Sequence, residues 1–192
     1  ASVGQARSLS VPPRGNRHSH TDDFLALVIP GVELKLGVVR HHTAEEAFER
    51  LESAGKAGIP QVVSLGALDM VNFGPMASVP ERYRDRNLYV HNPTITLMRT
   101  TPAECREIAR IVAGKLNAAE SPTVLYVPLR GVSAIATEGQ VFHDAEADEA
   151  LFSTLRELVD TSKVEVHEVD QDVNDPEFAL AMANRLHELI GE

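Results

Sequence analysis

The stretch Gly66–Gly74, with the sequence GALDMVNFG, combines residue types that suit a binding site. Asp69 and Asn72 stand three residues apart, so a carboxylate and an amide can face one ligand. Gly66 has no Cβ, which allows a positive φ or a close approach of the backbone to a bound molecule. Asp69 is also a candidate general acid or base. The alternative is that Asp69 and Asn72 satisfy the backbone of their own loop.

Arg99, Thr100 and Thr101 stand directly before a predicted helix that begins with the sequence TPAE. The free N–H groups and the dipole at a helix start favour an anion, and a guanidinium with two hydroxyls adds donors. We therefore predict that these three residues bind an anion. The alternative is that Thr101 only caps the helix, in a capping box with Glu104, and that Arg99 is solvated.

His91 and Asn92 close the strand that precedes this segment. A histidine at a strand end is a candidate general base or ligand anchor, because its imidazole titrates near neutral pH. Asn92 is a second candidate for ligand binding. A structural role for His91, and a simple Asn-Pro turn at Asn92, are the alternatives.

Ser133 lies in a long connection that also contains His143 and Asp144. A serine, a histidine and an acid can form a hydrolytic triad, but the chain has no G-x-S-x-G elbow. We therefore expect Ser133 to bind a ligand rather than to act as a nucleophile. The chain also has no Walker A sequence and no G-x-G-x-x-G sequence.

No metal site is predicted. Cys105 is the only cysteine, which excludes a cysteine cluster, and its place in a predicted helix indicates buried packing. The acidic run at 170–175 has neither the glycine nor the final glutamate of an EF-hand loop, so we expect it to cap the last helix.

Predicted strands and helices alternate along the chain and determine where these residues meet. Apolar runs predict strands at 61–65, 87–91, 123–127 and 164–169, and capping patterns predict helices that begin near 43, 101, 144 and 175. This order predicts an α/β fold: a Rossmann-like three-layer domain with a mostly parallel sheet and helices on both faces. Ligands of such sheets bind beyond the carboxyl ends of the strands, where the residues above lie.

Residues 1–23 have no periodicity and are predicted to be a tail, whereas 24–192 are predicted to form one domain, with a further strand at 32–39. Residues 66–86 are predicted to be irregular. A loop of this length is usually a lid, a binding loop or an interface. Met70, Val71 and Phe73 would then pack beneath a ligand or against a second subunit.

Charge and hydropathy exclude some classes of partner. The 192 residues carry a formal net charge of −10, which argues against a general nucleic-acid binder. No apolar run approaches the roughly 18 residues of a membrane span, and the first twenty residues lack the apolar core of a secretory signal. We therefore expect no nucleic acid, no membrane and a cytoplasmic location.

Three stretches carry a resemblance to a known family: GIPQVVSLGALDMVNFG, VPERYRDRNLYVHNPTITLMRTTPAE and PLRGVSAIATEGQVFHDAEADEALF. In these stretches the chain resembles the Tm-1-like ATP-binding proteins, an uncharacterised family named for a tomato mosaic virus resistance protein. The resemblance runs from about residue 49 to residue 178. Residues 1–45 lack the glycine-rich turn with which the second domain of that family begins.

The resemblance implies two Rossmann-like domains, of which this chain is similar to the second, C-terminal one. It implies that ATP belongs mainly to the first domain, which would be a partner of this one, in the same protein or as a separate chain. It also gives more weight to Asp69, Asn72, His91, Arg99 and the two threonines as residues of a site or an interface. It implies no reaction.

Two hypotheses follow. In the first, the domain binds an anionic small molecule or a nucleotide at the carboxyl edge of the strands, with Asp69 and His91 as acid–base residues. In the second, the domain is an interdomain or homo-oligomer interaction module without catalytic activity. The sequence does not decide whether the protein is an enzyme.

Overall fold

The computed structural model describes residues 51–191. The elements are α2 (Ser53–Lys56), β1 (Gln61–Ser64), β2 (Met70–Phe73), η1 (Met76–Ser78), η2 (Glu81–Tyr83), β3 (Leu88–Asn92), β4 (Ile95–Arg99), α3 (Pro102–Asn117), β5 (Thr123–Pro128), α4 (Ala145–Leu158), β6 (Val164–Val169) and α5 (Pro176–Gly191). The predicted tail at 1–23, the predicted strand at 32–39 and the start of the helix predicted near 43 lie outside the described residues.

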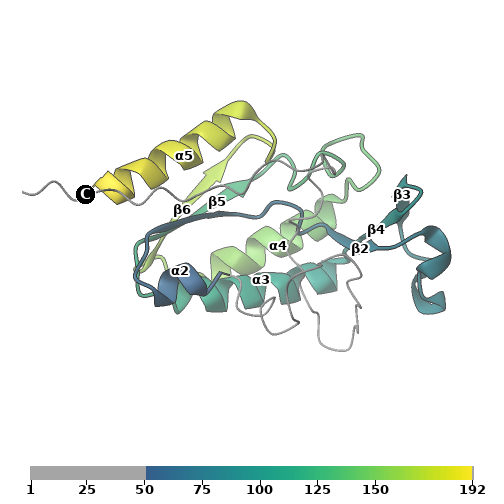
Figure 1. The fold of residues 1–192 in the computed structure, drawn as a ribbon, viewed down its shortest axis with the longest axis horizontal. Helices are drawn as coiled ribbons and strands as arrows, with labels where there is room; N and C mark the ends of the chain where they lie inside the picture. Colours follow the sequence, from purple (N-terminus) through teal and green to yellow (C-terminus); the bar gives the residue numbers. More distant parts are fainter. Residues whose placement is uncertain (1–50, 192) are drawn as a thin grey trace, which may run out of the picture.

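The main sheet contains three parallel strands in the order β1-β5-β6. Val63 pairs with Leu125, and Leu125 pairs in turn with Val166. Helices α3 and α4 lie together on one face of this sheet, and α5 covers the other face (Figure 1). The predicted α/β architecture, a mostly parallel sheet between two helical layers, is therefore confirmed.

Strand β5 is the centre of the domain, and all six of its residues are buried. Successive side chains of a strand point to opposite faces. Leu125 and Val127 accordingly belong to the core formed with α3 and α4, whereas Val124 and Tyr126 pack with Phe178 of α5. Burial of each large apolar side chain contributes about 1.5–3 kcal/mol. The continuous apolar run TVLYV is thus explained by two covered faces.

The helix starts follow the predicted capping patterns. Thr101 and Glu104 form both halves of a capping box at the start of α3, with Pro102 as its first residue. Asp144 caps α4 by accepting a hydrogen bond from the backbone N–H of Ala147. At the start of α5, Asp175 accepts one from the N–H of Glu177.

A second, antiparallel sheet corrects the prediction for 66–101. Part of the expected irregular loop is β2, and the segment between Asn92 and Thr100 is largely β4; with β3 they form a sheet in the order β2-β4-β3. The strand predicted at 87–91 therefore belongs to this sheet and not to the parallel one. The cause is the turn at Asn92, whose Oδ1 accepts from the N–H of Thr94 at 2.9 Å and reverses the chain.

The antiparallel sheet has a small core of its own, formed by Val71, Val79, Tyr83 and Met98. The ring of Phe73 packs on that of Tyr83 with 5.8 Å between their centroids. The side chains that were considered as a surface for a second subunit thus help to fill the interior of the domain.

Candidate functional site

A cavity of about 560 Å³ lies at the carboxyl end of β1 and beside the antiparallel sheet. Five segments far apart in the sequence contribute to its wall: the loop after β1, β2, the β3–β4 hairpin, the connection after β5 and the turn before α5. The polar residues of the wall are Ser64, Gly66, Asn72, His91, Ser133 and Asn174. Most of the remaining wall is aliphatic, and its volume is that of a site for a small molecule.

Four residues predicted from the sequence meet at this cavity: Gly66, Asn72, His91 and Ser133. Gly66 and Ser133 follow the parallel strands β1 and β5, whose carboxyl ends lie at one edge of the sheet. Asn72 and His91 reach the cavity from β2 and β3 of the antiparallel sheet. Asn174 was expected only to cap α5, and its place on the cavity wall was missed. Its position just after β6 was the available signal.

Gly66 does not have the positive φ that was considered for it; the left-handed residue is its neighbour Ala67, with φ 60°. The N–H of Ala67 donates to the carbonyl of Val132 at 2.7 Å and so joins the loop after β1 to the loop after β5. A left-handed alanine is strained, and such strain is common where backbone is held for function.

Asp69 lies directly behind the cavity wall, with no exposed surface. The hydroxyl of Ser133, which does line the cavity, donates to Asp69 Oδ2 at 2.7 Å. Asp69 Oδ1 has no hydrogen-bond partner among residues 51–191. Burial raises the pKa of Asp69, although the hydrogen bond from Ser133 and the charge of Arg99 oppose the rise. A buried carboxyl group with a raised pKa is a candidate for proton exchange with a bound molecule.

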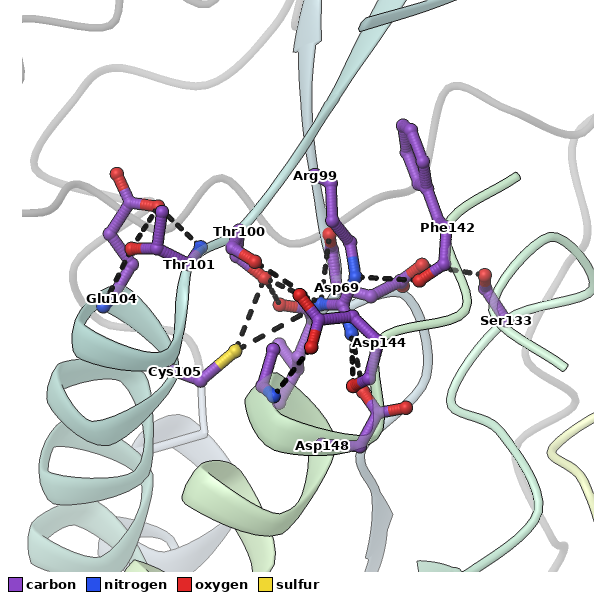
Figure 2. A network of polar contacts seen from close by, with 12 residues as sticks. Asp69, Arg99, Thr100, Thr101, Glu104, Cys105, Ser133, Phe142, Asp144 and Asp148 are labelled. Carbon is purple, nitrogen blue, oxygen red and sulfur yellow. Dashed lines mark hydrogen bonds and ion pairs between the residues drawn. The ribbon is translucent and has the colours of Figure 1, made fainter. Parts of the chain in front are cut away.

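Arg99 is buried, and each of its guanidinium nitrogens donates to a group of the protein (Figure 2). Nε donates to the carbonyl of Phe142 at 2.8 Å, Nη1 to Thr100 Oγ1 at 3.0 Å and Nη2 to Asp148 Oδ1 at 2.6 Å. The geometry thus gives Arg99 a structural role that joins β4, α3 and α4. Its predicted contact with an external anion stays a prediction.

Thr100 and Cys105 complete this buried network. Thr100 Oγ1 lies 3.3 Å from Cys105 Sγ and 3.2 Å from the carbonyl oxygen of Leu68, and its N–H donates to the carbonyl of Asp69. Burial raises the pKa of the Cys105 thiol, while the bond to Thr100 and the charge of Arg99 oppose this. Cys105 is therefore an unreactive core residue, as its helical position indicated.

The start of α3 already holds an anion, which is the carboxylate of Glu104. That carboxylate accepts from the N–H of Thr101 at 2.7 Å, from Thr101 Oγ1 at 2.9 Å and from both Nη atoms of Arg86. Burial alone would raise the pKa of Glu104, but the bonds from Arg86 and Thr101 outweigh it and lower the pKa. Thr101 thus caps the helix in a capping box with Glu104, which was the alternative to ligand binding. The predicted contact of Thr101 with a ligand stays a prediction.

His91 and Asn92 differ in their relation to the cavity. His91 is exposed, lines the cavity and lies 6.3 Å from the ring of Tyr89. Asn92 Oδ1 accepts from the N–H and the hydroxyl of Thr94. Asn92 therefore stabilises the hairpin turn, and its predicted contact with a ligand stays a prediction.

The loop after β5 offers backbone donors. Within residues 51–191, the N–H groups of Ser133, Ala134 and Ile135 have no hydrogen-bond acceptor, and all three residues line the cavity. Successive free N–H groups in a turn suit an anion. Sequence reasoning missed this feature because GVSAIA resembles no phosphate-binding motif.

Metal ligands are not gathered in the described part of the chain: it contains no group of three or more His, Cys, Asp or Glu placed to hold an ion. Among the helices of residues 51–191, none is long and apolar enough to cross a membrane.

Comparison with known proteins gives one family. Residues 37–190 match the model of the C-terminal domain of an uncharacterised protein family (UPF0261). A UPF0261 protein of Clostridium tetani is 56% identical over 137 residues, which are 71% of this chain and 34% of that protein. One from Rhizobium meliloti is 46% identical over 134 residues, 69% of this chain and 34% of its own length.

A plant protein is also similar. The ToMV resistance protein Tm-1(GCR237) of Solanum lycopersicum is 38% identical over 141 residues, which are 73% of this chain and 19% of the plant protein. The matched part of this chain thus spans about a third of its bacterial relatives and a fifth of the plant one.

Proposed function

Because this chain belongs to the UPF0261 family, as its C-terminal domain, we propose that the domain binds an anionic small molecule or a nucleotide in the cavity at the carboxyl edge of β1 and β5. The observation that carries the proposal is the cavity itself. It has the volume of a small-molecule site, and Gly66, Asn72, His91 and Ser133 meet on its wall from separate segments.

The cavity wall has an apolar part and a part with hydrogen-bond donors, which would contact different parts of the ligand. Val63, Leu68, Leu97 and Val132 provide apolar surface for the body of a small molecule or for a base. The free N–H groups of 133–135 provide donors for a carboxylate or a phosphate. These loop groups support an anion better than Arg99, whose nitrogens already donate within the protein.

Asp69 and His91 are the proposed acid–base residues. His91 lies on the cavity wall, and Asp69 reaches it through the hydroxyl of Ser133. Proton exchange with a bound molecule is the chemistry that this pair of positions supports. The geometry favours no particular reaction.

Calorimetry with the 192-residue chain tests the proposal, using ATP with and without magnesium beside a set of organic acids. The matched variants are Ala134→Trp and Ala179→Trp. Both alanines are exposed, but only Ala134 lines the cavity. We expect binding to be lost in Ala134→Trp and kept in Ala179→Trp. Equal binding to both variants would mean that the ligand binds outside this cavity. If no compound of the set gives a heat of binding, the proposal of an anionic or nucleotide ligand is contradicted.

A second candidate function is an interaction module, supported by exposed apolar side chains on α5. Leu180 is 60% exposed and Ile190 is 66% exposed. A surface of this kind suits another domain of the same protein, a separate chain or a second copy. Light scattering coupled to size exclusion tests for the second copy, since a monomer at all concentrations would exclude a homo-oligomer.

A further inference from the structure

Ser133 connects the cavity to the buried carboxylate of Asp69. The residue is 7% exposed, and the proton of its hydroxyl is donated to Asp69 Oδ2 at 2.7 Å (Figure 2). A hydroxyl group has a single proton and two lone pairs. Ser133 Oγ therefore faces the cavity as a hydrogen-bond acceptor, and Asp69 fixes this direction.

Asn72 is a second polar residue of the same wall. Its Oδ1 is buried and has no donor among residues 51–191, and the same is true of Asp69 Oδ1. Because almost none of its surface is open to the cavity, Asn72 Oδ1 is out of reach of a bound molecule in this conformation.

We propose that the ligand of this cavity carries a hydroxyl or amino group, which donates to Ser133 Oγ, on a body that packs against the aliphatic walls. This inference rests on the proposed function, since it names the ligand class for the same cavity. The hydroxyls of a sugar, the amino group of a base and the alcohol of a hydroxy acid all qualify. An ether of the same shape does not. Asp69 is a positioning residue in this recognition.

Matched probe pairs test the inference in the 192-residue chain. The pairs are benzyl alcohol with benzyl methyl ether, and adenosine with purine riboside, which lacks the amino group. Dissociation constants come from NMR titration, and shifts of the backbone amides of Gly66 and Ser133 locate the probe. We expect the donor-bearing member of each pair to bind about tenfold more tightly, the size of one net hydrogen bond.

Two variants assign the preference to Ser133. Ser133→Ala should bring the two dissociation constants of a pair together. Asp69→Asn places an amide N–H beside Ser133 Oγ, which frees the hydroxyl proton for the cavity, so the preference should shift towards the ether. Ser153→Ala is the matched control, because Ser153 is an exposed serine of α4 that does not line the cavity, and it should keep the tenfold preference.

The outcomes distinguish the donor inference from the proposed function on which it rests. If none of the four probes shifts the cavity amides, the donor inference is overturned, whereas the proposed function is decided by the calorimetry with ATP and organic acids. If probes bind but the members of a pair bind equally, or if Ser133→Ala keeps the preference, only the donor inference is overturned. Should Ser133→Ala fail to give a folded amide spectrum, Asp69→Asn decides the matter, and an unchanged preference there would overturn it.

Discussion

Asp69 and Asp148 are two carboxyl groups beside one buried cation, Arg99. Burial raises the pKa of Asp148 as well, although the charge and hydrogen bond of Arg99 oppose the rise. Desolvation thus outweighs the ion pair at both acids, as expected for charges taken far out of water. Burial around Arg99 therefore favours the protonated form of both acids relative to water.

The raised pKa of Asp69 should be visible in the pH dependence of stability. Above the ordinary carboxyl pKa the folded chain still holds a proton that the unfolded chain has released. The free energy of unfolding therefore falls as pH rises through the interval up to the raised pKa of Asp69. We expect Asp69→Asn to reduce this fall, measured by urea unfolding from pH 4 to 7.5. The exposed Asp85→Asn is the control, and the same slope in both variants would contradict the prediction.

Replacement of Arg99 should cost far more than replacement of an exposed arginine. Arg99→Met leaves the Asp148 carboxylate and the Phe142 carbonyl without their donor, and we expect a loss of about 3–5 kcal/mol. Arg130→Met breaks an equally short but exposed pair with Asp170 and should cost far less. Urea unfolding of both variants provides the measurement. Similar losses in the two would mean that Arg99 does not hold the elements together.

At the scale of elements, the start of α3 is stabilised by the carboxylate of Glu104, which both caps the helix and pairs with Arg86. The lowered pKa of Glu104 means that the folded chain keeps this charge at a pH where the unfolded chain has gained a proton. Its contribution to stability is complete above the ordinary glutamate pKa. That contribution is lost as pH falls through the lowered pKa.

Glu104→Gln should therefore make stability less sensitive to acid. We expect it to destabilise the domain by about 1 kcal/mol at pH 7, from the loss of the cap and the ion pair. The difference from the unaltered chain should shrink as pH falls from 6 to 3, followed by urea unfolding. The control is Glu107→Gln, whose pair with Arg110 is more exposed. A constant difference across this range would sink the idea.

The sequence predicted elements where local chemistry determines them. Capping residues and covered apolar runs located β1, β5, β6 and three helix starts. The antiparallel sheet was missed because its strands depend on pairing between distant residues: Asn72 pairs with Leu97, and Tyr89 also pairs with Leu97. The signal that could have revealed this sheet was the turn at Asn92. Such a turn is compatible with a β-hairpin as well as with a loop that leads into a helix.

The same distinction explains the candidate site. Gly66 and Ser133 could be predicted to meet because β1 and β5 are parallel neighbours and bring their segments to one edge. Asn72 and His91 reach the same cavity through the antiparallel sheet, which the sequence did not reveal. The burial of Arg99 and its bonds within the protein could not be predicted. They depend on Asp148, 49 residues along the chain, and on a carbonyl of an irregular loop. The hydrogen bond between Ser133 and Asp69 spans 64 residues and has no sequence signal.

At the scale of the whole molecule, the outer face of α5 exposes large apolar side chains. One face of this helix packs on β5 through Phe178, but Leu180 and Ile190 are mostly exposed. The matched part of the chain spans about a third of the bacterial relatives. Another domain is one occupant that could cover this face. A second copy of the chain is the other occupant.

The double variant Leu180→Glu with Ile190→Glu should distinguish these occupants. If copies of the chain associate through α5, two buried carboxylates at the contact would be strongly unfavourable, and light scattering should show the variant as a monomer where the unaltered chain is a dimer or larger. Leu158→Glu on α4, 38% exposed and on the opposite face of the sheet, is the control and should leave assembly unchanged. Because both α5 side chains are largely exposed within one chain, the stability of the monomer should change by less than about 0.5 kcal/mol. An assembly that survives the double variant would exclude α5 as the contact between copies, while an unaltered chain that is already monomeric would leave this face to another domain.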